Sequence, residues 1–535
     1  MHYGSILKSN HQLTGKTMVQ NVIKSLLEEK AYPEPTAGVR LVETHVSFIF
    51  MTDRFVYKVK KAVNFGFLDF TTLDRRRFYC EEEVRLNSRL CPEIYLGVVE
   101  LREAAGGASF AGDGKVIDYA VKMKRLPEER MLVHLLERGE AGVKDMTRIA
   151  SVLVPFHRQA QRGPRIDACG ATGVIRGNWE ENFRQSAQFV GVTISAQELA
   201  DIRRFVERFL QENEEEFRLR VAGGFIRECD GDLHSGNICL TDRVCIFDCI
   251  EFNERFRFID TAADLSFLLM DLEYAGRPDL GAALLGAYRQ ESGDTGMGAL
   301  LDFYKMYRAF VRGKVISLRL NEQGLPPAEF AALKLSASRY FRLARGYTFR
   351  GRLAPSLIIT CGVMGSGKST LARELGLELG LMLQRSDVVR KRLAGEPPRE
   401  ATDAYRAGIY TEQMDRATYA ALLDEAKREL SQGRGIIIDA TFRRSSDRAL
   451  FQGVAATLGA PFFVIETHCP ESQIRERLEA RRFDESEVSD GRWEHFHRQQ
   501  AEFEQPAAGA SIRIDTTLPL ATEVDAALRA MGLLA

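Results

Sequence analysis

The chain lacks several features that would assign it to a membrane or to the secretory route. Its 535 residues contain no run of about 18 consecutive apolar side chains, so we expect no bilayer-spanning segment and no membrane partner. Residues 1–17 lack the apolar core of a secretory signal and are expected to form a disordered extension. The formal net charge of −1 provides no global attraction to nucleic acid, although a local basic patch is compatible with it. A cytoplasmic protein is therefore expected.

Paired cysteine motifs are also absent. The nine cysteines are an odd number, and no two of them are separated by only two residues. This distribution predicts reduced thiols, with no disulfide framework and no zinc site. Cys245 and Cys249 are four residues apart, but they flank a predicted strand and are not expected to bind a metal.

The length of the chain exceeds what one hydrophobic core supports, and two or three domains are expected. The N-terminal half begins with strand and helix patterns and then becomes mainly helical, with strands at 46–51, 54–60, 94–101 and 116–126, a helix at 73–90 and long helical patterns after Pro127. This order predicts an α+β domain over 18–345. Its small, strand-bearing lobe covers about 18–126, and its helical lobe covers about 127–345.

The last third of the chain has a different pattern. Residues 346–355 are typical of a linker. Apolar strand patterns at 357–361, 435–440 and 461–467 then alternate with helical patterns. This order predicts an α/β domain over 356–535, with a parallel sheet flanked by helices on both faces.

A glycine-rich loop, Gly362-Val-Met-Gly-Ser-Gly-Lys-Ser369, follows the first of these strands. Backbone N–H groups of such a P-loop curl round phosphates, which requires glycine where the chain approaches them closely. Lys368 is expected to reach the β- and γ-phosphates, and the Ser369 hydroxyl to ligate Mg²⁺. We therefore expect ATP and Mg²⁺ to bind here, and the predicted nucleotide contacts are Gly362, Gly365, Ser366, Gly367, Lys368, Ser369 and Thr370.

Charged residues beyond the loop are candidates for phosphoryl-transfer chemistry. Asp387 is expected near the γ-phosphate, where a carboxylate can accept a proton from an attacking hydroxyl. Arg390 is placed to hold an acceptor phosphate or the transferred group. Asp439 ends an apolar strand and is expected at the metal or the acceptor. Helix capping for the two aspartates, and a solvated surface for Arg390, are the structural alternatives.

Arg477 and Arg481 are four residues apart in a helical pattern and therefore share one face. We predict that they close over the nucleotide as a lid, with a solvated basic face as the alternative. With the Asp-x-x-Arg motif at 387–390 and the Asp-Ala-Thr motif at 439–441, they resemble P-loop kinases of the polynucleotide-kinase, zeta-toxin and gluconate-kinase type. The resemblance covers about 355–505 and implies a kinase with a hydroxyl acceptor.

A second, unrelated motif lies in the N-terminal domain. Asp230-Gly-Asp232-Leu-His-Ser-Gly-Asn237 is followed by Ile246-Phe247-Asp248. These segments resemble the protein-kinase-like fold, in its aminoglycoside-phosphotransferase and small-molecule-kinase branch. The resemblance implies a bilobal fold with Asp232 as the base, and with Asn237 and Asp248 as Mg²⁺ ligands. The whole chain resembles bacterial fusions of such a domain with an ATP-binding P-loop domain.

Residues upstream complete the set that the kinase-like resemblance implies. Lys58 lies in the middle of a predicted strand, where a half-buried amine needs an anion, and it is the expected phosphate anchor. Glu83 is its expected ion-pair partner, with Glu81 and Glu82 as alternatives. Met123 begins the predicted hinge, whose backbone groups are expected to contact adenine.

Two features depart from that branch. The predicted phosphate-covering loop at 43–47 contains no glycine, and Asp230 stands where the branch usually has histidine. His234 is expected to have a structural role in the loop. Asp260 and Asp264 are expected to cap a helix and to brace the catalytic loop.

The leading interpretation is a bifunctional ATP-dependent kinase with a hydroxyl acceptor at each site, either a small molecule of sugar or nucleoside type or a nucleic-acid end. One alternative is a 5′-hydroxyl polynucleotide kinase in the P-loop domain, with the N-terminal domain binding substrate or regulating. Another is a nucleotide-sensing switch in which one domain is a pseudokinase.

Overall fold

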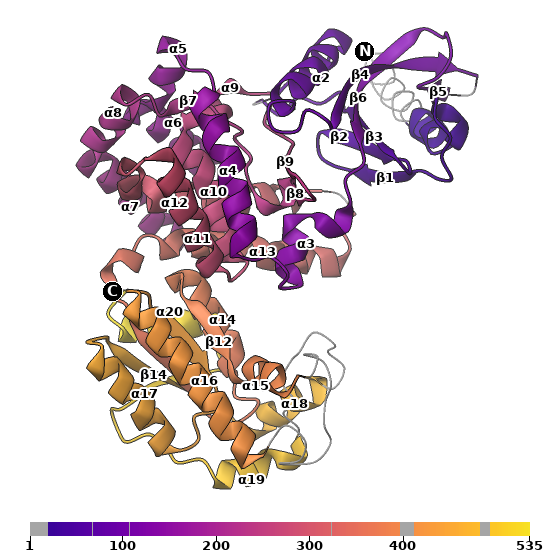
Figure 1. Cartoon of the computed structure of the whole chain (residues 1–535). Coiled ribbons are helices and arrows are strands. Elements are labelled where there is room, and N and C mark those ends of the chain that lie inside the picture. Colours follow the sequence, from indigo (N-terminus) through magenta and orange to yellow (C-terminus); the bar gives the residue numbers. More distant parts are fainter. Residues whose placement is uncertain are drawn as a thin grey trace, which may run out of the picture. The chain divides into compact units, whose positions relative to one another are not determined.

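The computed structural model describes residues 20–66, 68–105, 107–322, 324–395, 411–481 and 493–534. The chain forms two compact units, of which the first comprises 1–178, 212–271 and 282–304 and the second comprises 179–211, 272–281 and 305–535. Figure 1 follows the chain from the indigo N-terminal strands to the yellow C-terminal helices. Among the described residues, none of the helices combines the length and the apolarity that crossing a bilayer requires.

The first unit contains a six-stranded antiparallel sheet in the order β1-β2-β3-β6-β4-β5. Its strands are β1 (Arg40–Glu43), β2 (Ser47–Met51), β3 (Phe55–Lys60), β4 (Tyr95–Ala104), β5 (Gly107–Ser109) and β6 (Val116–Lys124). Helix α2 (Leu73–Asn87) begins where the Thr72 hydroxyl accepts the Arg75 N–H, at 3.3 Å. It packs against β4 and β6, as Figure 1 shows. The predicted strands and the helix of this region are confirmed.

The rest of the first unit is mainly helical and carries two small antiparallel sheets. The sheets pair β7 (Ile226–Glu228) with β10 (Phe258–Asp260), and β8 (Ile238–Leu240) with β9 (Val244–Ile246). The helices are α3 (Leu132–Glu137), α4 (Val143–Gln159), α5 (Pro164–Asp167), α8 (Glu214–Ala222) and α9 (Glu254–Arg257). Residues of both units occur in α6 (Thr172–Ser186), α7 (Ala196–Glu212), α10 (Thr261–Tyr274), α11 (Pro278–Ser292) and α12 (Leu301–Arg319).

The second unit contains the predicted parallel sheet, with five strands in the order β12-β13-β11-β14-β15. The strands are β11 (Leu357–Cys361), β12 (Met382–Arg385), β13 (Ile436–Asp439), β14 (Phe462–His468) and β15 (Ile512–Asp515). β11 and β13 are fully buried, which explains why they read as uninterrupted apolar runs.

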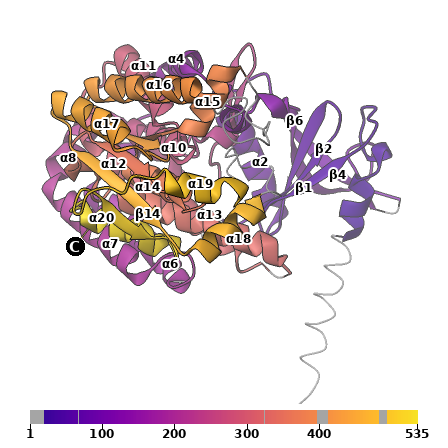
Figure 2. The ribbon, with the colours of Figure 1, turned by 90° about the horizontal axis from the view of Figure 1, so that it is seen from below.

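Helices cover both faces of this sheet. Ile359 and Ile438 point to one face, where they pack with α15 (Ser386–Ala394), α16 (Glu412–Ser431) and α17 (Ser445–Thr457). Ile358 and Ile437 point to the other face, where they pack with α14 (Lys368–Leu379) and α20 (Leu520–Ala530). Figure 2 shows α17 and α20 on opposite sides of β14. Helices α18 (Glu471–Arg481) and α19 (Phe496–Ala501) also belong to this unit.

Helix α13 (Pro327–Gly346) packs against α14 through buried ion pairs. Glu374 of α14 contacts Arg339 Nε at 3.0 Å and Arg342 Nη1 at 3.4 Å. Glu378 contacts Arg345 Nη2 at 2.8 Å. The two helices approach so closely that a Cβ on Gly346 would lie 2.1 Å from the Glu378 carbonyl oxygen. These contacts fix the helix that begins at the P-loop.

The Glu378 carboxyl gives the stability of this contact a pH dependence. Burial raises the pKa of Glu378 to about 7, although Arg345 opposes the shift. The folded state therefore binds more protons than the unfolded state between about pH 4.5 and 7, and the free energy of unfolding falls as pH rises through that window. We expect Glu378→Gln to flatten this slope in urea unfolding measured at pH 5 and at pH 7. The same slope in the variant as in the wild type would contradict the assignment.

Candidate phosphate-binding sites

The P-loop of the second unit is built on glycines in the left-handed region. Gly362, Gly365 and Gly367 have φ values of 139°, 75° and 91°. A Cβ on Gly362 would lie 2.7 Å from the Thr467 carbonyl oxygen, and one on Gly365 would lie 2.9 Å from Ile474 Cγ2. Glycine is therefore required both by the backbone conformation and by the space. The loop connects the end of β11 to the first turn of α14, so its N–H groups lie at the positive end of a helix.

Side chains of the loop and its neighbours hold it in shape. Lys368 Nζ donates to the Val363 carbonyl oxygen at 2.7 Å, so the amine lies over the loop itself. The Ser366 and Thr467 hydroxyls are 2.7 Å apart. Gln499 Oε1 of α19 accepts the Met364 N–H at 2.7 Å. Ser369 lies in the first turn of α14, as predicted, and Thr370 follows it with an exposed side chain.

The predicted carboxylates follow the carboxyl ends of adjacent parallel strands. Asp439 is the last residue of β13, and its Oδ1 accepts the Thr360 hydroxyl at 3.0 Å. Arg385 at the end of β12 pairs in register with Asp439, and its Nε lies 3.6 Å from Asp439 Oδ2. Asp387 follows two residues later in the first turn of α15 and is half-buried. These residues and the P-loop thus share one edge of the sheet.

Arg390 is buried and belongs to an ion pair with a partly buried carboxylate that the sequence did not predict. Its Nη1 lies 2.7 Å from Asp415 Oδ1, and Arg443 Nη2 lies 2.9 Å from Asp415 Oδ2. Asp415 is on α16 and Arg443 follows β13, so no local spacing relates the three residues. The carboxylate holds both guanidinium groups near the same edge of the sheet as Asp439.

Arg477 of α18 lies beside the P-loop. Its guanidinium donates to the carbonyl oxygen and to the hydroxyl of Thr516, the latter at 3.1 Å, and to the Gly365 carbonyl oxygen at 3.5 Å. Thr516 also touches the loop, because a Cβ on Gly367 would lie 3.0 Å from its Cγ2. Arg481 is the last residue of α18, and its side chain lies outside the described part of the structure.

In the first unit, the structure brings Asp232 and Asn237 together. Asn237 Nδ2 donates to Asp232 Oδ2 and to the Asp232 carbonyl oxygen, both at 3.1 Å. His234 Nδ1 accepts the Gly236 N–H at 3.1 Å, and its Nε2 is 3.5 Å from Asp232 Oδ2. Phe247, next to Asp248, donates its N–H to the Asn237 carbonyl oxygen at 3.0 Å. The two predicted metal ligands thus come from adjacent segments.

Lys58 contacts two acids. Its Nζ lies 2.9 Å from Glu83 Oε1 and 2.5 Å from Asp248 Oδ1. Glu83 is the partner among the three candidates, because Glu81 and Glu82 pair with arginines of their own helix. Burial alone would lower the pKa of Lys58, but Asp248 and Glu83 raise it well above its usual value. Burial likewise opposes the ionisation of Glu83, yet its two lysine neighbours lower the pKa of that carboxyl to about 2. Both groups are held charged.

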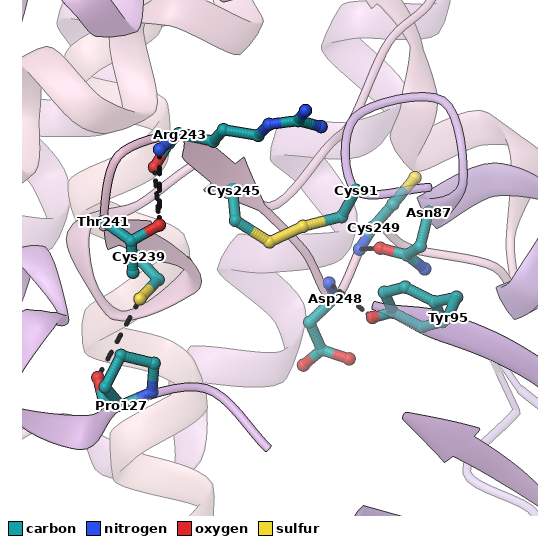
Figure 3. The surroundings of a disulfide bond; sticks show 10 residues. All are labelled: Asn87, Cys91, Tyr95, Pro127, Cys239, Thr241, Arg243, Cys245, Asp248 and Cys249. Carbon is teal, nitrogen blue, oxygen red and sulfur yellow. Dashed lines mark hydrogen bonds between the residues drawn. A yellow bond between two sulfur atoms is a disulfide. The ribbon is translucent and has the colours of Figure 1, made fainter. Parts of the chain in front are cut away.

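Asp248 lies just after β9 in a left-handed conformation, with φ 65°. Few residues other than glycine adopt this conformation, and it costs on the order of 1–3 kcal/mol when surrounding contacts enforce it. The Asp248 N–H donates to the Tyr95 hydroxyl at 3.2 Å, and the Cys249 N–H donates to Asn87 Oδ1 at 2.8 Å. Figure 3 shows both contacts beside the Asp248 carboxylate. Met123, the predicted hinge residue, pairs in register with Tyr95.

Helix α10 supports the Asp232 loop through hydrogen bonds, which confirms the expectation that Asp264 braces this loop. Asp264 accepts the N–H groups of Asp230 and Gly231 at 3.1 and 2.8 Å. Asp271 of the same helix accepts the Ser235 N–H at 2.8 Å, a contact that the sequence did not predict. Burial and the neighbouring Asp264 raise the pKa of Asp230 well above its usual value.

Arg220 and Ala262 define the surroundings of Asp260. The Asp260 carboxylate accepts two hydrogen bonds from the Arg220 guanidinium, at 2.8 and 2.6 Å, and the Ala262 N–H at 2.9 Å. This residue therefore caps α10, as expected. His157, Cys229 and Asp264 lie close enough to resemble a metal site, but His157 already bonds Tyr288 and Asp264 through its two ring nitrogens. His157 therefore links Tyr288 to Asp264 through hydrogen bonds.

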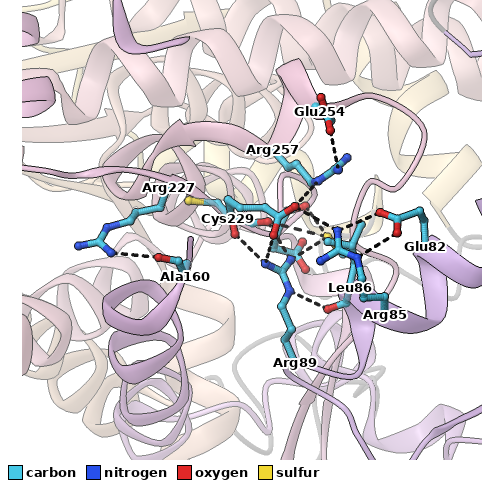
Figure 4. A network of polar contacts seen from close by, with 12 residues as sticks. Glu82, Arg85, Leu86, Arg89, Ala160, Arg227, Cys229, Glu254 and Arg257 are labelled. Atoms are coloured by element: carbon cyan, nitrogen blue, oxygen red, sulfur yellow. Dashed lines mark hydrogen bonds and ion pairs between the residues drawn. The ribbon is translucent and has the colours of Figure 1, made fainter. Parts of the chain in front are cut away.

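A buried glutamate connects α2 to the strand before the Asp232 loop. Glu228 at the end of β7 contacts Arg85 at 3.2 Å, Arg89 at 3.5 Å and Arg257 at 3.2 Å. Arg89 also donates to the Glu228 and Cys229 carbonyl oxygens, at 2.7 and 3.1 Å. Figure 4 shows these guanidinium groups converging from α2, its C-terminal end and α9. The helix that carries Glu83 is thereby fixed to the base of the loop.

One prediction about cysteines is wrong. Cys91 and Cys245 form a disulfide, with their Cα atoms 5.3 Å apart, whereas the cysteine distribution predicted reduced thiols (Figure 3). Sequence spacing could not predict this pairing, because the two cysteines are 154 positions apart and come together only when β9 packs near the end of α2. Cys249 is a buried free thiol that donates to the Asp230 carbonyl oxygen at 3.1 Å.

The second unit thus has the parallel sheet, the glycine loop and the following helix that define the class of P-loop domains. Residues 357–506 match a family model described as an AAA domain. The uncharacterized protein Rv2004c of Mycobacterium tuberculosis is 33% identical over 445 residues, which cover 82% of this chain and 84% of that protein. The chain belongs to the family of that mycobacterial protein.

Two solved structures resemble about a third of the chain. A gluconokinase from Sinorhizobium meliloti has 21% sequence identity and a TM-score of 0.25, over 34% of this chain and 94% of its own. The APS kinase CysC of Mycobacterium tuberculosis has 16% identity and a TM-score of 0.26, over 34% of this chain and 99% of its own.

Proposed function

We propose that the chain is an ATP-dependent kinase with two phosphoryl-transfer sites, each acting on a hydroxyl acceptor. The observation that supports the P-loop site best is the loop of three left-handed glycines that leads from β11 to Lys368 and the N-terminus of α14 at one edge of the sheet. There Lys368 would contact the β- and γ-phosphates, and Arg477 would stabilise the charge of the transferred group. Asp387 would accept the acceptor's proton.

For the first unit, the contacts of Lys58 with Glu83 and Asp248 support a protein-kinase-like site of the small-molecule branch. In this proposal Lys58 anchors ATP phosphates and the Asp232 carboxylate accepts the hydroxyl proton. The hinge at Met123 would contact adenine. The two sites correspond to a kinase-like domain over 18–345 and a P-loop kinase domain over 356–535.

The residues at both sites fit Mg²⁺, which prefers oxygen ligands. The Asn237 amide oxygen and the partly exposed Asp248 carboxylate would hold it in the first unit. The Ser369 hydroxyl and Asp439 would hold it beside the P-loop. Bound Mg²⁺ would neutralise phosphate charge as the transferred group moves.

The test is transfer of labelled γ-phosphate by the wild type, Asp232→Asn and Lys368→Ala. Each is offered sugars, nucleosides, aminoglycosides and 5′-hydroxyl oligonucleotides. We expect each variant to lose one class of labelled product and to keep the other. A product on oligonucleotides alone, lost only in Lys368→Ala, would favour the polynucleotide-kinase alternative. Nucleotide binding at both sites with no transfer to any acceptor would favour a switch.

A further inference from the structure

A second lysine on β3 lies beside the proposed phosphate anchor. Side chains two residues apart on a strand point to the same face, so Lys60 and Lys58 both face α2. Lys60 Nζ lies 2.5 Å from Glu83 Oε2, whereas Lys58 Nζ contacts the other oxygen of the same carboxylate. Each oxygen of Glu83 therefore has its own ammonium group.

Lys60 also forms an ion pair with Glu251, which follows Asp248 by three residues. All three members of this cluster are buried: the side-chain exposure is 1% for Lys60, 0% for Glu83 and 7% for Glu251. Burial disfavours the ammonium form of Lys60, yet Glu251 and Glu83 raise the pKa of the amine above its usual value. A buried cation of this kind persists only because the paired carboxylates compensate its desolvation.

The backbone around Glu251 is fixed as well. Its carbonyl oxygen accepts Arg257 Nη1 at 3.3 Å, and the Ile250 N–H donates to the Asp230 carbonyl oxygen at 3.2 Å. Lys60 therefore connects three elements: β3, α2 and the segment that begins at Asp248. The same three elements carry Lys58, Glu83 and Asp248.

We propose that Lys60 and Glu251 are positioning residues for the N-terminal ATP site. Lys60 holds Glu83 so that the other carboxylate oxygen, Oε1, contacts Lys58. The Lys60–Glu251 ion pair holds the segment that begins at Asp248 against β3. The inference rests on the proposed function of this site. According to this inference, the position of Lys58 depends on the buried ion pair between Lys60 and Glu251.

The experiment measures Mg·ATP binding by calorimetry in the full chain carrying Lys368→Ala, so that the affinity measured is that of the N-terminal site. We expect Lys60→Met to weaken binding by about 10-fold, since a misaligned anchor loses a charge-assisted contact. Glu251→Gln keeps the volume and a hydrogen-bond acceptor, and we expect a loss of about 3-fold. Lys60→Arg, which keeps the charge, should recover part of the affinity.

Lys122→Met is the matched control. Lys122 lies on β6 of the same sheet and pairs with Glu34, away from Glu83. Affinity equal to this control in both Lys60→Met and Glu251→Gln would overturn the inference while leaving the proposed site intact. Failure of the Lys368→Ala chain itself to bind Mg·ATP would overturn the proposed site and the inference with it. If Lys60→Met does not fold, Glu251→Gln and Lys60→Arg decide the question.

Discussion

Replacing Glu228 with alanine is expected to lower the free energy of unfolding of the first unit by about 3–5 kcal/mol, because it leaves the buried Arg257 guanidinium without this carboxylate. Glu228 is almost fully buried, and Arg257 beside it is equally inaccessible. Burial opposes ionisation of Glu228, but the surrounding arginines lower the pKa of its carboxyl below the usual value. The stabilisation is therefore present above about pH 4.5 and is lost as pH falls through the lowered pKa.

Glu82→Ala provides the control for this experiment. Glu82 also pairs with Arg85, at 2.9 Å, but on the exposed side of α2. An exposed pair of this kind is expected to contribute less than about 1 kcal/mol. Thermal and urea unfolding of both variants would separate the two cases. Equal losses in Glu82→Ala and Glu228→Ala would show that the convergence of arginines on Glu228 adds no stability.

The second large effect concerns the P-loop. We expect Lys368→Ala to reduce phosphoryl transfer at this site by about 10²–10³-fold, because it removes a preorganised positive charge from the transferred phosphate. The reaction is followed in the Asp232→Asn background, so that only the P-loop site contributes. The unfolding temperature should change little, since the amine donates to the loop's own backbone, at the Val363 carbonyl oxygen, and this oxygen is an uncharged acceptor.

Lys427→Ala is the matched control for Lys368→Ala. Lys427 lies on α16 with half of its side chain exposed and pairs only weakly with Asp424, at 3.4 Å. Its removal should leave transfer unchanged. Transfer that survives in Lys368→Ala at the wild-type rate would exclude the P-loop as a phosphoryl-transfer site.

The sequence best predicted the structural features that depend on residues close to one another along the chain. The P-loop is local, since its glycines, its lysine and the start of α14 follow one another along the chain. The Asp232 motif is local in the same sense, and Asp264 could be anticipated because a helix start follows the motif closely.

Contacts between distant segments were not predictable in the same way. Asp415 joins Arg390 to Arg443, and Glu251 joins Lys60, only after helices and strands have packed. The Cys91–Cys245 pair is the clearest case, because composition favoured free thiols and only the tertiary fold brings the two sulfurs together. Buried pairs of this kind produce no recognisable spacing of residues along the sequence.

The contact between α13 and α14 has a practical consequence for dividing the protein. A fragment that starts in the segment 346–355 would contain every strand of the parallel sheet but would lack α13. Glu374 and Glu378 would then lose their arginine partners, and the side of α14 that packs against α13 would be exposed to solvent. A fragment that begins at Pro327 is about 20 residues longer and keeps these partners, so a soluble, nucleotide-binding P-loop domain should be recovered from it.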